Sequence, residues 1–421
     1  MKKSITFKRS FNDQLIEILC YYSDDKNKQD NAMKIESLKI ENVGGISSLS
    51  LDSFDPNLNI ICGENGIGKT NILDSIASLF SGYEPISISV KSGFEQGCIK
   101  SSVDGKVISR PIKKKYTNLT YTKWECVNDD KNANFNLLYL KVNRVFKYRR
   151  ESSINSDPDV TNRTSENAEG LDNNDIKQWF ISRYLHSAHV DNLTDVQQEN
   201  IKLAISCFSL LDNKVTFYKT TTQNEIIVKT PTGEIYFELL SSGFRSILFI
   251  LLGIIKEIEY RFQNNNVLAS DFNGVILIDE IELHLHPEWQ GKVCSVLTKT
   301  FPKAQFIIST HSPHVIQTAE ANEVIALSGQ NGHLEKRTLD IAPHGFKGWT
   351  VEEILTDVMG MKDTRTEWFR SKQKEFDKAL DENDVLNANK IFDELRLKLH
   401  PSSTYLALSR FQLDMLNGRN K

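Results

Sequence analysis

The stretch LNIICGENGIGKTNILDSIASLF, residues 58–80, decides how the rest of the chain is interpreted. An apolar run is followed by a glycine-rich loop and then by apolar residues at helical spacing, which predicts a buried strand, a loop and a helix. The loop GENGIGKT, residues 63–70, satisfies the pattern G-x-x-x-x-G-K-[ST], which binds phosphate when it joins a strand to a helix. We therefore predict an α/β fold built around a phosphate-binding loop.

The residue types of this loop suit a bound triphosphate. Glycines let successive backbone N–H groups curl around a phosphate, and the helix N-terminus adds its dipole. The ammonium of Lys69 would meet the β and γ oxygens, while Thr70 would hold Mg²⁺. ATP and Mg²⁺ are therefore the expected cofactors. The predicted nucleotide-binding residues of the loop are Gly63, Asn65, Gly66, Gly68, Lys69 and Thr70.

A second apolar run, VILI at residues 275–278, is followed by two adjacent acids, Asp279 and Glu280. Beside a phosphate loop, Asp279 would reach the metal, often through water, and Glu280 would polarise the attacking water. Adjacent acids at the end of a strand are also common in ordinary solvated turns. Because the phosphate loop is present, we predict Asp279 as a metal ligand and Glu280 as the catalytic base.

The segment LSSGFRS, residues 240–246, opens a strongly apolar helix. Either Ser241 or Ser242 takes the cap position, and Gly243 lies in the first turn. An ordinary capped helix would have the same appearance. The order and spacing of the segments favour a signature in which Ser241, Ser242 and Gly243 contact nucleotide.

The segment FIISTHSPHV, residues 306–315, places His311 just past another buried strand. There its imidazole would hydrogen-bond the γ-phosphate or the attacking water. A lone histidine is more often structural, but this one follows the acidic pair on the next apolar strand. We predict His311 as a catalytic residue.

Taken in order, these motifs resemble those of the compact cassette-type ATPases related to the SMC and OLD families. Two segments are similar to those of stand-alone ATPases of bacterial antiphage defence, above all the Septu and retron-associated ATPases. These segments are DEIELHLHPEWQ, residues 279–290, and FPKAQFIISTHSPHV, residues 301–315. The resemblance covers roughly residues 34–330. It implies an ABC-type fold with a mostly parallel sheet, an antiparallel β-subdomain, a helical insertion and a helical C-terminal region.

In such families two ATP molecules are sandwiched between the phosphate loop of one subunit and the signature of the other, and the acid at Glu280 is the hydrolytic base. The resemblance therefore implies a homodimer or a higher homo-oligomer. Two features depart from the family pattern. Phe244-Arg245 stands where transporter cassettes usually have a glutamine, and the Q-loop glutamine cannot be placed, although Gln96 lies in a plausible interval.

Two other groups of side chains have alternative interpretations. His284 and His286, with Glu282 nearby, could ligate a metal. No third ligand is evident from a distant segment, so we favour packing and interface contacts. The basic residues Lys113–Lys115, and the cluster of Lys141, Arg144, Lys147, Arg149 and Arg150, could contact a nucleic-acid backbone. Charge runs more often form a solvated face.

Composition and charge narrow the class of protein. The chain has 421 residues, of which 39% are hydrophobic and 25% charged, so it is ordinary globular protein. A formal net charge of −4 excludes a strongly basic nucleic-acid binder in bulk. Six cysteines form no C-x-x-C pair, and the longest apolar run, residues 247–255, is about half of what a bilayer needs. We expect a cytoplasmic protein with reduced cysteines and no membrane partner.

Changes in local composition along the sequence suggest domain boundaries. Residues 151–175 have almost no large apolar side chains and predict a mobile loop. The predicted parts are an N-terminal extension (1–32), an N-terminal ATPase lobe (33–150), a mobile loop with helical insertion (151–211), a C-terminal ATPase lobe (212–340) and a helical C-terminal region suited to partner docking (341–421).

Missing parts help to choose among functions. An OLD-type nuclease would carry a Toprim domain, but the residues beyond His344 contain no D-x-D on a strand-like run. SMC-type coiled coils would need heptads between the phosphate loop and the signature, and none are present. Our first hypothesis is a regulatory ATPase of antiphage defence that controls an HNH-type nuclease subunit, with DNA as a further candidate partner through that complex. The alternative is an ATP-operated DNA clamp of repair or recombination; a transporter subunit fits less well.

Overall fold

The computed structural model describes residues 33–81, 88–113, 136–143, 153, 156–157, 170–171, 175–189, 191–263, 266–340 and 345–419. The predicted N-terminal extension and most of the predicted mobile loop at 151–175 lie outside these residues. Within the described ranges, no helix is both long and apolar enough to cross a membrane.

A ten-stranded sheet, in the order β5-β4-β1-β2-β13-β12-β3-β11-β10-β6, forms the centre of the described chain. Five neighbouring strands, β12, β3, β11, β10 and β6, run parallel, while β5, β4, β1 and β2 form an antiparallel arm. This is the predicted fold class. The strands are β1 (Ile35–Val43), β2 (Ile46–Leu51), β3 (Leu58–Gly63), β4 (Gln96–Val103), β5 (Lys106–Lys113), β6 (Leu137–Leu140), β10 (Val275–Ile278), β11 (Gln305–Ser309), β12 (Val324–Gln330) and β13 (His333–Lys336).

The central strands are apolar on both faces because each face carries its own core. On β10, Ile276 and Ile278 belong to one apolar cluster, whereas Val275 and Leu277 belong to the other. The two-residue period of a strand sends neighbouring side chains to opposite faces. Continuous apolar runs such as VILI are therefore what a parallel sheet covered on both sides requires.

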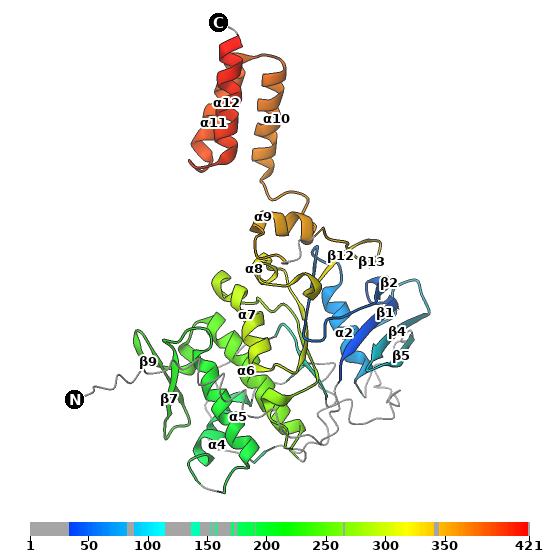
Figure 1. The fold of residues 1–421 in the computed structure, drawn as a ribbon, viewed down its shortest axis with the longest axis vertical. Helices are drawn as coiled ribbons and strands as arrows, with labels where there is room; N and C mark the ends of the chain where they lie inside the picture. Colours follow the sequence, from blue (N-terminus) through cyan, green and yellow to red (C-terminus); the bar gives the residue numbers. More distant parts are fainter. Residues whose placement is uncertain are drawn as a thin grey trace, which may run out of the picture.

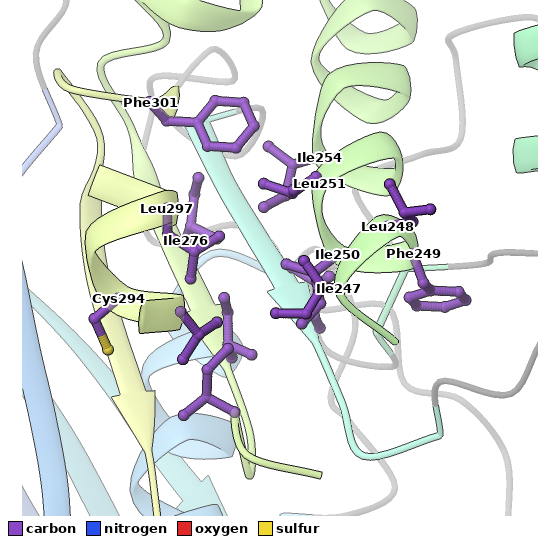
Figure 2. Close-up of a cluster of buried hydrophobic side chains, with 14 of the residues drawn as sticks. Ile247, Leu248, Phe249, Ile250, Leu251, Ile254, Ile276, Cys294, Leu297 and Phe301 are labelled. Carbon is purple, nitrogen blue, oxygen red and sulfur yellow. The ribbon is translucent and has the colours of Figure 1, made fainter. Parts of the chain in front are cut away.

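Helices cover both faces of this sheet (Figure 1). Helix α2 (Lys69–Leu79) packs on the face shared with the antiparallel arm, and α6 (Ser242–Arg261) and α7 (Pro287–Thr300) pack on the other. Figure 2 shows Ile247, Leu251 and Ile254 of α6 directed toward Ile276 of β10 and the residues of α7. Helix α6 thus carries the apolar contact between the sheet and the helical insertion.

A three-stranded sheet of β7 (Thr216–Thr220), β8 (Ile226–Thr230) and β9 (Gly233–Tyr236) follows the helical insertion, which consists of α4 (Ile176–His186) and α5 (Asp195–Ser206). A buried ion pair joins the insertion to α6, because Arg183 Nε lies 2.5 Å from Glu259 Oε1. Trp179 Nε1 donates to the same carboxylate oxygen at 2.9 Å. A buried carboxylate needs such partners, so this group fixes the insertion against α6.

Beyond the sheet the chain is helical, as predicted. The short helix α9 (Val351–Glu353) and the π-helix η7 (Ile354–Val358) lead to α10 (Glu367–Asp381), α11 (Val385–Lys398) and α12 (Thr404–Arg419), whereas the short helix α8 (Pro313–Ile316) lies earlier, between β11 and β12. The last three helices share an apolar cluster of their own and stand apart from the sheet in Figure 1. The remaining short elements are the 3-10 helices η3 (Cys207–Ser209), η4 (Phe237–Leu239), η5 (Ala269–Asp271) and η6 (Ala321–Glu323).

The register of α6 against β10 gives a stability prediction. Leu251 is fully buried on α6, so Leu251→Ala should lower the free energy of unfolding by about 2–5 kcal/mol through lost burial and a residual cavity. Leu239, of the same residue type but 68% exposed, is the matched control, and Leu239→Ala should change stability by less than about 0.5 kcal/mol. Urea unfolding measures both; equal losses would contradict this packing.

Candidate nucleotide site

The phosphate loop connects β3 to α2 through left-handed backbone that only glycine adopts freely. Gly63, Gly66 and Gly68 have φ values of 144°, 76° and 108°. A Cβ atom on Gly63 would lie 2.7 Å from the carbonyl oxygen of Leu327 on β12, so no larger residue fits there. Helix α2 starts at Lys69 without a side-chain cap and without an acid in its first turn. Its free N–H groups suit an anion.

Lys69 is buried inside the loop and satisfies the loop's own carbonyls. Its Nζ donates to Gly63 O at 3.0 Å and to Glu64 O at 3.1 Å. Burial lowers the pKa of this ammonium, while neighbouring groups, Asp279 among them, act in the opposite direction. A buried cation at this position would be in place to contact phosphate oxygens, and this role of Lys69 stays a prediction.

Thr70 and Asp279, the two predicted metal ligands, lie side by side. Thr70 Oγ1 is 3.0 Å from Asp279 Oδ2, and Ser309 Oγ donates to Asp279 Oδ1 at 2.5 Å. The three residues come from α2, the end of β10 and the end of β11. Hydroxyl and carboxylate oxygens are the ligands that Mg²⁺ prefers, so the pair fits the ion. Their roles as ligands stay predictions.

Glu280 lies directly after β10 in an unusual backbone conformation. Its φ of 48° is left-handed, which is unfavourable for a residue with a side chain. Its N–H donates to Ser309 Oγ at 2.8 Å, which fixes this turn. Strained backbone of this kind concentrates at functional sites, and here it leaves Glu280 at the carboxyl edge of the sheet, beside Asp279.

Glu282 clamps the segment that carries His311. Its Oε2 accepts from Thr310 Oγ1 at 2.8 Å, and its Oε1 accepts from the His311 N–H at 2.6 Å. The pairing of β10 with β11 therefore places His311 at the same edge of the sheet as Glu280. Sequence reasoning missed this clamp, as it missed Ser309, because both contacts join residues about thirty positions apart.

The signature opens α6 against the segment that follows Glu282. Ser241 is the N-cap and accepts from Phe244 N–H at 3.4 Å, so the cap is Ser241 and Ser242 is the first helical residue. A Cβ on Gly243 would lie 2.7 Å from His284 O. The Phe244 ring packs edge-on against Trp289 at 5.3 Å. Gly243 is thus required by close packing.

His284 and His286 have structural contacts consistent with the packing interpretation. His286 caps α7, since its Nδ1 accepts from Glu288 N–H at 3.4 Å. With Ser241–Gly243, these histidines line an open pocket of about 1410 Å³ that also includes residues 209–213 and no residue of the phosphate loop. In the described part of the chain, no three His, Cys, Asp or Glu side chains gather as a metal site.

Other sequence candidates lie away from this edge or outside the described residues. Gln96 begins β4 and pairs with Lys113 in the antiparallel arm, so it does not follow a parallel strand as a Q-loop residue would. Lys141 forms an ion pair with Asp74 of α2, with its Nζ 3.1 Å from Asp74 Oδ1. The remaining basic residues, Lys114, Lys115, Arg144, Lys147, Arg149 and Arg150, lie outside the described ranges.

Comparison with known proteins agrees with this geometry. A family model described as "AAA domain, putative AbiEii toxin, Type IV TA system" matches residues 125–317. The Septu protein PtuA of Bacillus thuringiensis is 42% identical over 392 residues, covering 90% of this chain and 97% of that protein. The chain belongs to the Septu PtuA family.

Two further proteins are similar to part of this chain. The Retron Ec83 probable ATPase of Escherichia coli is 38% identical over 120 residues, covering 28% of this chain and 21% of that protein. The SMC head domain from Thermotoga maritima has 16% identity and a TM-score of 0.42, over 73% of this chain and 100% of that one. With the AAA match and the phosphate loop, the PtuA family member is an ATPase, as predicted.

The Glu282 clamp gives a prediction for turnover. Glu282→Gln leaves a single acceptor oxygen, so only one of the Thr310 and His311 donors keeps its acceptor, and His311 should shift while the phosphate loop stays intact. We expect ATP turnover to fall by about 10²–10³-fold with ATP affinity nearly unchanged. Glu199→Gln, at an exposed position on α5 away from this edge, is the control. Unchanged steady-state turnover in Glu282→Gln would show that the clamp does not position His311.

Proposed function

We propose that this chain is the ATP-dependent regulatory subunit of an antiphage defence complex, in which bound ATP joins two copies of the chain and the pair controls an HNH-type nuclease. Membership in the PtuA family supports the defence role. The proposal of an ATP sandwich rests on the separation of the phosphate loop from the signature within one copy.

That separation is the observation that carries the proposal. Ser241 and Ser242 are exposed at the N-terminus of α6, beside a large open pocket. The phosphate loop of the same copy contributes nothing to that pocket, although both segments have backbone N–H groups suited to phosphate. A second copy that brings its phosphate loop to this pocket would place its bound triphosphate against the N-terminus of α6.

Each residue then has a chemical task. Lys69 would exchange the carbonyls of Gly63 and Glu64 for phosphate oxygens, and Thr70 with Asp279 would hold the metal. Magnesium supplies positive charge that neutralises the β and γ oxygens. Glu280 would accept a proton from the attacking water, with His311 held nearby through Glu282.

Regulation follows from the same arrangement. Nucleotide that contacts two copies stabilises the closed pair, and its hydrolysis removes the γ-phosphate contact and favours the open state. The rate of ATP hydrolysis would therefore set the lifetime of the closed pair, and slow hydrolysis would suit control of the nuclease.

The C-terminal bundle of α10, α11 and α12 is our candidate docking surface for the nuclease. Its own apolar cluster is internal, yet Leu408, Phe411 and Met415 of α12 are 56%, 62% and 50% exposed. Their spacing of three and four residues places them on one helical face. An exposed apolar stripe of this kind marks a surface for a partner.

Trapping the ATP-bound pair tests the proposal. Glu280→Gln keeps the groups that bind nucleotide but removes the base, so with Mg²⁺ and ATP it should accumulate as a dimer or a larger assembly. Light scattering coupled to size exclusion measures the mass with and without ATP. Lys69→Ala, which removes the phosphate contact, is the control and should show neither ATP binding nor a mass change.

The two variants also separate the ways in which the proposal can fail. Full ATP affinity in Lys69→Ala would refute the phosphate-loop assignment. If Glu280→Gln binds ATP but keeps the mass of its nucleotide-free form, the ATP sandwich is wrong even though the nucleotide site is correct.

A further inference from the structure

Arg337, the residue that follows β13, lies on the β12 side of β3 and its phosphate loop. Asp279, which follows β10, lies on the other side. Arg337 N–H donates to Ala326 O at 2.8 Å, which fixes its backbone to β12. The same strand pairs with β3, where Leu327 lies opposite Gly63. Only β12 therefore lies between Arg337 and Gly63, the first residue of the phosphate loop, although 274 positions separate these two residues in sequence.

The guanidinium of Arg337 lies between the phosphate loop and the start of the C-terminal region. Its Nη1 donates to Asp357 O in η7 at 2.9 Å. A Cβ placed on Gly360 would lie 2.8 Å from Arg337 Nη2 and 3.2 Å from Glu64 Oε1. Glu64 of the loop, Arg337 and Gly360 thus meet at one point.

The segment that Arg337 holds has unusual backbone. In η7 the Met359 N–H donates to Ile354 O at 2.9 Å, a five-residue step typical of π-helices, which are frequent at functional sites. Gly360 follows with a φ of 80°, in the left-handed region that glycine tolerates. Only residues 361–366 separate this turn from α10, the first helix of the bundle.

The positive charge of Arg337 also acts on the thiol of Cys62 in β3. Burial raises the pKa of the Cys62 thiol to about 12, and the charges of Lys69 and Arg337 act in the opposite direction. Arginine keeps its charge at every physiological pH, and its planar fork can hold two neighbours at once. Arg337 therefore keeps a positive charge beside the loop and η7 at every physiological pH.

We propose that Arg337 is a positioning residue that couples occupancy of the phosphate loop to η7 and, through Gly360, to the C-terminal bundle. The inference rests on the proposed function. In the structure Glu64 O accepts from Lys69, and phosphate would draw that ammonium away. Glu64 would then shift relative to Arg337 and Gly360, so nucleotide would change the position of η7 and of the bundle that binds the partner.

Hydrogen exchange with and without ATP and Mg²⁺ tests this coupling in the full chain. In the wild type, ATP should slow exchange of the amides of residues 354–361 several-fold. Arg337→Ala should abolish that response while the calorimetric ATP affinity stays within about threefold of the wild type. Arg337→Lys, which keeps the charge but loses the fork, should give an intermediate response. Lys336→Ala, an exposed neighbour on β13, is the control and should respond as the wild type does.

Each other outcome has a defined meaning. An undiminished ATP response of residues 354–361 in either Arg337 variant overturns the coupling, as does wild-type protein that binds ATP without any change there. A loss of ATP affinity above about tenfold in Arg337→Ala would place Arg337 in nucleotide binding itself and would also overturn it. Failure of the wild type to bind ATP, by contrast, would refute the proposed function.

Discussion

The buried carboxylate of Asp279 accepts hydrogen bonds from Thr70 and Ser309, and these contacts join the three segments on which the site depends. A buried charge is costly unless it is paired, so the group fixes the start of α2 and the ends of β10 and β11 at one edge of the sheet. The hydroxyl of Ser309 also accepts from Glu280 N–H, which extends the same network to the predicted base. The sheet register therefore determines the geometry of the nucleotide site.

Local patterns predict much of this fold because they act over short stretches of chain. Glycines and Lys69 between an apolar strand and an apolar helix indicate the phosphate loop, and the acids after VILI indicate Asp279 and Glu280. The signature helix and the strand before His311 follow from the same kind of pattern. The prediction of His311 as a catalytic residue agrees with the rule that carboxyl ends of parallel strands meet at one edge of a sheet.

Contacts between distant segments could not be predicted in this way. We did not predict the clamp of Glu282 on Thr310 and His311, because its acid lies in a loop that also reads as a turn. The hairpin of β12 and β13 escaped notice, and Arg337 with it, because its strands end in polar residues around a tight turn. Gln96 shows why spacing alone could not place the Q-loop residue, since its interval in sequence fits while its strand belongs to the antiparallel arm.

The central claim is that ATP joins the phosphate loop of one copy to the signature of another. Disulfide cross-linking of a mixture of Asn65→Cys chains and Ser242→Cys chains tests this most directly, in a background where Cys20, Cys98 and Cys126 are replaced by serine and Cys62, Cys207 and Cys294 stay buried. The account predicts a cross-linked pair that forms with ATP and Mg²⁺ and requires both variants. Absence of that product while ATP is bound, or its formation without nucleotide, would contradict the claim.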